Sequence, residues 1–116
     1  MKLLVAGSTG MVGSAICRVA ESTRKVELAT PSRSELDLTN QESVLNYIKK
    51  TKPDCIVIAA ARVGGIFANN TYPAEFIYVN TMIQSNLIHS AYLAEIEKLV
   101  FLGSSACQIH VFPVLF

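Results

Sequence analysis

Three glycines near the start of the chain have the spacing of a phosphate-binding turn. Gly7, Gly10 and Gly13 form the pattern G-x-x-G-x-x-G between an apolar run at residues 2–6 and a segment with helical apolar spacing. Such glycines allow a tight turn, close approach of a pyrophosphate and close packing of helix on strand, while the helix N-terminus attracts the anion. We therefore predict a dinucleotide site formed by Gly7, Ser8, Thr9, Gly10, Met11, Val12 and Gly13. The alternative is a set of turn glycines without a ligand.

The residues that follow the second apolar run, 30–38, bear on whether NAD or NADP is the preferred dinucleotide. Residues 30–32 supply no acidic side chain that could accept hydrogen bonds from the ribose hydroxyls of NAD. Arg33 instead places a guanidinium where it could hold a 2′-phosphate, which favours NADP; an exposed loop arginine without a ligand is the alternative. Asp37 could accept a hydrogen bond from the adenine amino group or serve a local turn or helix start. Leu38 is placed beside it in the predicted cofactor site.

Small and polar residues follow the later apolar runs. In an open α/β sheet, ligands lie beyond the carboxyl ends of the strands. Ala60 is small enough for a cofactor to lie against the backbone, and Leu102, Gly103 and Ser105 end the fourth run at the same predicted edge. Ser104 could hydrogen-bond a substrate hydroxyl or carbonyl, although serines in turns are common without chemistry.

The elements that must position these residues alternate along the chain. Four short apolar runs typical of strands are residues 2–6, 26–29, 55–60 and 99–102. We expect Thr39 to cap a helix that ends before Pro53, and Pro73 to open a long helix in which the Asn80 amide hydrogen-bonds neighbouring backbone. The order βαβαβαβ predicts the α/β class: part of a Rossmann-like, doubly wound parallel sheet with helices on both faces and four strands in the order 3-2-1-4.

The length and composition of the chain limit the classes of partner that it could bind. The chain has 116 residues, enough for one domain, and a net charge of +1. Its basic residues are scattered apart from three lysines within residues 49–52, so we expect no nucleic-acid partner. Cys17, Cys55 and Cys107 suit unpaired thiols in a reducing cytosol, and no metal-site pattern is present. No apolar run reaches the roughly 18 residues of a membrane span, so we expect a cytoplasmic protein without a membrane partner.

Five stretches together resemble the GDP-L-fucose synthases, which are extended short-chain dehydrogenases/reductases of the NAD-dependent epimerase/dehydratase superfamily. The stretches are residues 10–16, 34–39, 59–66, 68–74 and 101–105. The resemblance implies NADPH as cofactor, conversion of GDP-4-keto-6-deoxy-mannose into GDP-L-fucose, and a homodimer in the full-length enzyme. It also implies that Arg33 contacts the 2′-phosphate and that Ser104 is the catalytic serine, which orients the sugar carbonyl.

The chain departs from the family pattern at three places. Ser8 and Thr9 stand where the family usually has His-Arg, and Arg62 stands where it usually has Lys. After Ser105 the family continues with Cys and then Ile-Tyr-Pro, whereas this chain continues with Ala106. The family's acid Tyr and its partner Lys form a Tyr-x-x-x-Lys pair, and no tyrosine of this chain has a lysine four residues later.

These departures define the predicted organisation. We expect residues 1–105 to be an NADP-binding domain portion, residues 106–116 to be a divergent tail, and the substrate domain to be absent. The expected function is the NADP-binding portion of a GDP-L-fucose synthase-like epimerase-reductase, inactive as this chain. The alternative is a dinucleotide-sensing module without enzymatic activity, or a chain that associates with full-length subunits.

Overall fold

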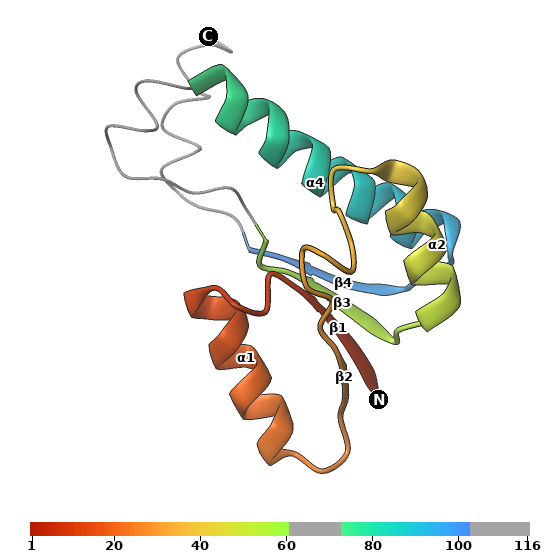
Figure 1. Cartoon of the computed structure of the whole chain (residues 1–116). Coiled ribbons are helices and arrows are strands. Elements are labelled where there is room, and N and C mark those ends of the chain that lie inside the picture. The colour runs from red at the N-terminus through yellow and green to blue at the C-terminus, as the bar shows by residue number, and fades with distance from the viewer. Residues whose placement is uncertain (61–72, 103–116) are drawn as a thin grey trace, which may run out of the picture.

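The computed structural model describes residues 1–60 and 73–102. Its elements are β1 (Lys2–Ala6), α1 (Met11–Ser22), β2 (Glu27–Ala29), α2 (Gln41–Thr51), β3 (Cys55–Ile58), α4 (Pro73–Leu93) and β4 (Lys98–Phe101). One parallel sheet lies between α1 on one face and α2 and α4 on the other (Figure 1). The predicted α/β class and the doubly wound arrangement are therefore confirmed.

The strand order differs from the prediction. The sheet has the order β2-β1-β3-β4, so the expected order 3-2-1-4 is wrong. The prediction placed the third strand at an edge, but its continuous apolar run is buried along Ile56, Val57 and Ile58 and needs neighbours on both sides. β2 has only three residues and begins with the exposed Glu27, which suits an edge.

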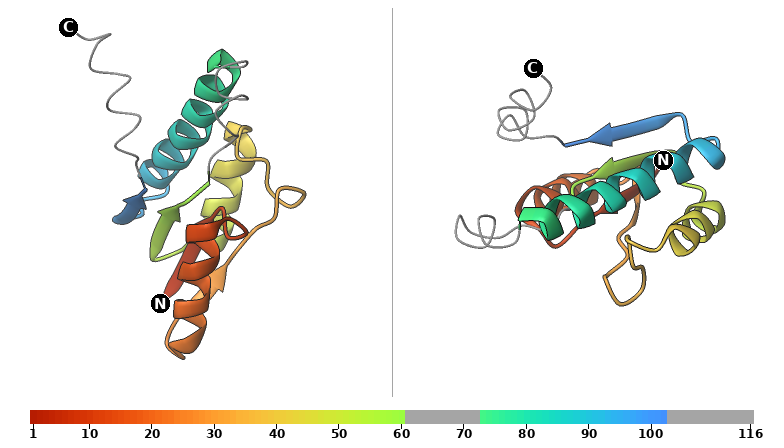
Figure 2. Two further views of the ribbon diagram at one scale, coloured as in Figure 1. Left: turned by 90° about the vertical axis from the view of Figure 1, so that its left-hand side faces the viewer. Right: turned by 90° about the horizontal axis from the view of Figure 1, so that it is seen from above.

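The two central strands, β1 and β3, contribute to two separate cores. Leu4, Ile56 and Ile58 face α2 and α4, whereas Val5 and Val57 face α1. This alternation follows from the two-residue period of a strand, which sends successive side chains to opposite faces. α2 and α4 lie side by side on the same face of the sheet (Figure 2) and pack against each other. The core on their side has more buried residues than the core under α1.

The start of α2 lies one residue later than predicted. Asn40, and not Thr39, is the N-cap residue, and its side-chain oxygen accepts a hydrogen bond from the backbone N–H of Ser43 at 3.0 Å. Thr39 is engaged elsewhere, since its backbone N–H and its hydroxyl both donate to Asp37 Oδ1. Asparagine caps helices at least as well as threonine, so the later start is favourable.

A buried amide ties α4 to the loop before α2. Asn86 is buried on α4, and its Nδ2 donates to the carbonyl oxygen of Leu38 at 2.9 Å. The sequence prediction assigned a bridging amide to Asn80, which is half-buried. The bridge from Asn86 was missed because its partner Leu38 lies 48 residues earlier, and such a contact leaves no local signal in the sequence.

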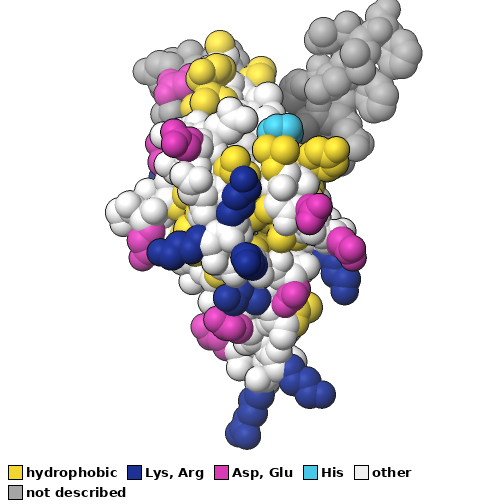
Figure 3. Space-filling view, turned by 90° about the vertical axis from the view of Figure 1, so that its right-hand side faces the viewer, with side chains coloured by type: hydrophobic (Ala, Val, Ile, Leu, Met, Phe, Trp, Pro, Cys, Tyr) yellow, Lys and Arg dark blue, Asp and Glu magenta, His cyan; other side chains and the backbone are white. Residues whose placement is uncertain are grey.

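The structure bears on the expectations about membrane spans, cysteines, metal sites and surface charge. No helix among residues 1–60 and 73–102 is long and apolar enough to cross a membrane. Cys17 and Cys55 are free thiols, and the same residues contain no cluster of metal-ligating side chains. Basic and acidic side chains are interspersed over the face seen in Figure 3. The absence of a nucleic-acid partner stays a prediction.

The core between the sheet and helices α2 and α4 can be tested by truncating one of its buried side chains. Leu87 is completely buried in it, whereas Leu93 on the same helix is 45% exposed. We expect Leu87→Ala to lower the free energy of unfolding by about 2–5 kcal/mol, because it removes buried methyl groups and leaves a cavity. Leu93→Ala makes the same chemical change at an exposed site and should cost less than about 1 kcal/mol. Chemical denaturation measures both, and equal effects would contradict the assigned core.

Candidate functional site

The carboxyl ends of the four strands meet at one edge of the sheet. The chain passes from β1 to β2 in one direction and then returns across β1 to place β3 on its other side. The change of direction lies between β1 and β3, and this is where ligands bind in open α/β sheets. The loop at residues 7–10 leaves β1 at that point (Figure 1).

Gly7 makes the turn out of β1 in a conformation that other residues rarely adopt. Its φ is +91°, and a Cβ there would lie 2.6 Å from both the Cα and the N of Ala60. The first predicted role, a tight turn, is thus required by both backbone angle and space. The backbone of Ala60, a half-buried residue after β3, therefore lies directly beside the loop.

Gly13 brings the first turn of α1 against the same loop. A Cβ at Gly13 would overlap the carbonyl oxygen of Gly7 and lie 2.8 Å from its carbonyl carbon. The predicted close packing of helix on the strand end is therefore present, and it depends on the absence of a side chain at Gly13.

Gly10 differs from the other two glycines because nothing in the described chain requires it. Its φ of −72° and ψ of 173° are open to any L-residue. A Cβ at Gly10 would meet only the Gly7 carbonyl oxygen, at 3.6 Å, which is an ordinary contact. The glycine at this position therefore leaves free space in front of the start of α1.

The N-terminus of α1 is uncapped, in contrast to that of α2. No side chain accepts a hydrogen bond at the start of α1, and its first turn contains no acidic residue. α2 has both the Asn40 cap and Glu42 in its first turn. The first amides of a helix have no partners within it and carry partial positive charge, so α1 offers donors and potential to an anion. The predicted residues Ser8, Thr9, Met11 and Val12 surround this position in sequence, and Met11 is 87% exposed.

The turn after β2 holds the residues predicted to contact the adenosine half. Arg33 is exposed in a turn whose ends are joined by hydrogen bonds between Ser32 and Glu35. Asp37 serves the local role that the sequence left open: two hydrogen bonds from Thr39 lower the pKa of its carboxyl group. Leu38 is half-buried and packs against the core on the α2 and α4 side. Contact of these residues with a cofactor stays a prediction.

The other predicted residues lie at the end of the sheet or beyond the described part. Leu102 is 41% exposed and continues the pairing of β4 with β3, since its N–H donates to the Ile58 carbonyl at 3.2 Å. Gly103, the catalytic candidate Ser104 and Ser105 lie outside the described residues, as do the predicted tail and domain boundary.

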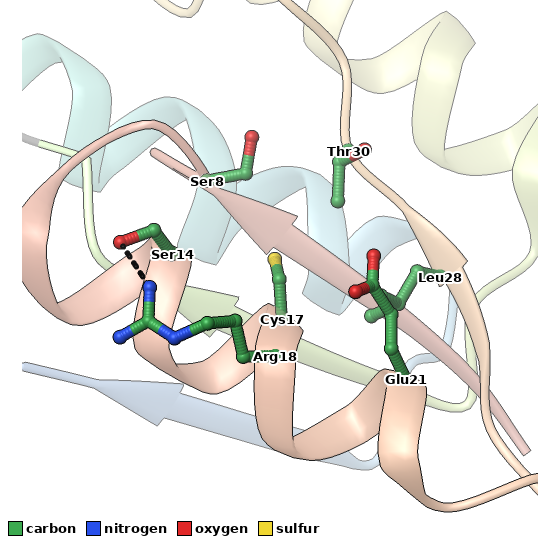
Figure 4. A pocket seen from close by; sticks show the side chains of 7 residues that line it. All are labelled: Ser8, Ser14, Cys17, Arg18, Glu21, Leu28 and Thr30. Carbon is green, nitrogen blue, oxygen red and sulfur yellow. Dashed lines mark hydrogen bonds between the residues drawn. The ribbon is translucent and has the colours of Figure 1, made fainter.

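The sequence prediction missed a cavity beside the glycine loop. It lies between α1 and the end of β2, has a volume of about 350 Å³, and is lined by Ser8, Ser14, Cys17, Arg18, Glu21, Leu28 and Thr30 (Figure 4). Burial and then the Glu21 carboxylate raise the pKa of the Cys17 thiol, which therefore stays protonated at neutral pH. The spacing of three and four residues from Ser14 to Glu21 could have indicated that they share a helix side.

Comparison with known proteins agrees with this geometry. The model of the NAD dependent epimerase/dehydratase family matches residues 3–109. The chain belongs to this family. It is 52% identical over 104 residues to GDP-L-fucose synthase 1 of Arabidopsis thaliana and 50% identical over 104 residues to GDP-L-fucose synthase of Escherichia coli strain K12. Both matches cover 90% of this chain but 32% of the relative, so the chain spans about a third of their length.

A solved structure supports the same fold assignment. The chain is similar to a GDP-mannoheptose C4 reductase from Campylobacter jejuni with NADP bound, with a TM-score of 0.82 and 38% sequence identity. The match covers 88% of this chain and 32% of that one. The Rossmann-like part of the fold prediction and the resemblance to GDP-L-fucose synthases are therefore confirmed.

The contrast between Gly10 and Gly13 gives a stability prediction. Gly13→Ala should destabilise the chain by about 1–3 kcal/mol or more, because the new methyl group meets backbone. Gly10→Ser should leave stability unchanged or raise it, since serine is a better N-cap than glycine and meets no close contact. Thermal and chemical unfolding of both variants provide the measurement. A Gly10→Ser variant as unstable as Gly13→Ala would show that the chain itself needs this glycine.

Proposed function

We propose that this chain binds NADP, with the pyrophosphate at the start of α1. The observation that carries the proposal is the uncapped N-terminus of α1 with free space at Gly10. An anion placed there would accept hydrogen bonds from the first amides of the helix, as in other dinucleotide-binding α/β folds. The glycine spacing, the position at the change of strand direction and the family membership support the same location.

We further propose that NADP is preferred to NAD. No acidic residue follows β2 directly, and the exposed Arg33 is available to an anionic group. In the described residues the one ion pair joins Lys2 and Glu27, so the Arg33 guanidinium is not held by a carboxylate there. The related Campylobacter jejuni reductase structure contains NADP, which supports this choice.

The enzyme context that we propose is that of a GDP-L-fucose synthase-like epimerase-reductase. Bound NADPH would supply the hydride for reduction of a keto sugar carried on GDP. Ser104 would hydrogen-bond the sugar carbonyl, and the small residue Ala60 would let the cofactor approach the end of β3. The chain has no Tyr-x-x-x-Lys pair, so we propose binding without turnover for the 116-residue chain. Identity near 50% to fucose synthases supports this context over a sensing module.

Gly10→Ser tests the pyrophosphate site. Its side chain would fill the free space and its hydroxyl would compete for the first amides of α1, so we expect NADP to bind at least about tenfold more weakly. Isothermal titration calorimetry gives the dissociation constants, and the thermal transition of the variant shows that it is folded. Unchanged NADP affinity in a folded Gly10→Ser variant would place the ligand elsewhere. Steady conversion of the GDP-keto sugar by the wild-type chain would contradict the absence of turnover.

We propose that α4 is the surface for the expected homodimer. Its 21 residues contain one charged side chain, Glu75, whereas a helix with one face in solvent normally carries charges there. Ile77, Tyr78, Ile88 and Tyr92 are all exposed on it. A second copy of this helix would cover them.

Ile88→Glu tests this association. Placing a charge on the exposed surface of α4 should convert a concentration-dependent dimer into a monomer, because burying an unpaired carboxylate is costly. Val19→Glu introduces the same charge at an exposed valine of α1 and should leave the dimer intact. Size-exclusion chromatography with light scattering measures the mass. A wild-type chain that stays monomeric over the accessible concentration range would refute the proposal.

A further inference from the structure

The cavity beside the glycine loop contains a cation that the proposed function has not used. The cavity opens between Ser8, the second residue of the loop, and Thr30, the first residue after β2. Ser14, Cys17 and Arg18 line it from the first two turns of α1 (Figure 4). It therefore extends from the place where we locate the pyrophosphate toward the end of β2.

The two charges of the cavity lie at different ends. The Arg18 guanidinium lies beside Ser14, near the start of the helix, with its Nη1 donating to Ser14 Oγ at 3.5 Å. Glu21 lies about one turn farther along α1, next to Leu28 of β2 (Figure 4). The Cys17 thiol between them is neutral because its pKa is raised. An anion would therefore be favoured only at the Arg18 end.

Arg18 is free to take a ligand. The ion pair of Lys2 with Glu27, the one that the described part of the chain contains, does not involve it. Its hydrogen bond to Ser14 is at the long limit and is directed to a hydroxyl that already donates to the Met11 carbonyl at 3.1 Å. Ser8 and Thr9 bring no charge to the glycine loop. Arg18 is therefore the one positively charged side chain among the residues that line the cavity.

We propose that Arg18 is a specificity-determining residue that binds the 2′-phosphate of NADP, with the hydroxyl of Ser8 as a further donor. This inference rests on the proposed binding of NADP by the glycine loop. A guanidinium suits a phosphate because its planar set of N–H donors matches two phosphate oxygens. Arg33 is exposed in the turn after β2 and does not line the cavity, so Arg18 would act on the phosphate from the side of α1, independently of Arg33. The Glu21 carboxylate would repel a phosphate at the other end of the cavity, next to Leu28.

The experiment compares NADP with NAD, which differ only in the 2′-phosphate. For Arg18→Met in the full chain we expect the dissociation constant of NADP to rise about tenfold and that of NAD to stay within about twofold. Arg18→Lys keeps the charge without the planar fork and should recover part of the loss. Arg24→Met is the matched control, since it removes an exposed arginine in the turn after α1, outside the cavity, and should change neither constant beyond about twofold.

Glu21→Gln gives an independent readout in the opposite direction. Removing the carboxylate should tighten NADP binding about two- to threefold and leave NAD unchanged, because only NADP carries the additional negative charge at this position. Circular dichroism melting confirms that every variant is folded.

The outcomes separate this inference from the proposed function. If wild-type chain binds NADP but Arg18→Met weakens NADP and NAD equally, or neither, the assignment of Arg18 is wrong and the proposed function stands. If the folded wild-type chain binds neither dinucleotide, the proposed function fails and the assignment of Arg18 fails with it. A loss confined to NADP, with Arg24→Met unaffected, supports both.

Discussion

The contact of α1 with the turn that leaves β1 is the constraint on which the site depends. Gly13 lies against the Gly7 carbonyl, and Gly7 lies against the backbone at the end of β3. The ends of β1 and β3 and the start of α1 thereby meet without any intervening side chain. The start of α1 is held beside the carboxyl ends of the paired strands β1 and β3, which is where the strand order changes direction.

The two faces of the sheet serve different purposes. The side with α2 and α4 contains the larger core and the capped start of α2 with Glu42 in its first turn, and Asn86 of α4 holds the loop before α2 by its hydrogen bond to Leu38. The α1 side has the smaller core, an uncapped helix start and an open cavity with Arg18 at its rim. The free amide donors and the positive potential at the start of α1 therefore lie on the side with the smaller core. The larger core under α2 and α4 contributes more of the stability.

Much of this could be read from the sequence because the signals are local. The glycine spacing, the apolar runs and the proline that opens α4 each report on neighbouring residues, and they located the strands, the helices and the roles of Gly7 and Gly13. Strand order is not local: it depends on which strand can bury both faces, and the burial of Ile56 to Ile58 decided it against the expected order. The cavity was missed for a related reason. Ser8, Arg18 and Thr30 meet only once α1 has folded back beside β2.

The close contacts at Gly7 and Gly13 also limit how this sequence can change. At both positions an added Cβ would meet main-chain atoms, not the end of a flexible side chain. Main-chain atoms are the same whatever residue is present, so no compensating substitution at the contacted position can create room. A damaging replacement of either glycine should therefore have few second-site suppressors nearby, whereas a replacement in the core beside Leu87 can be offset by repacking its neighbours.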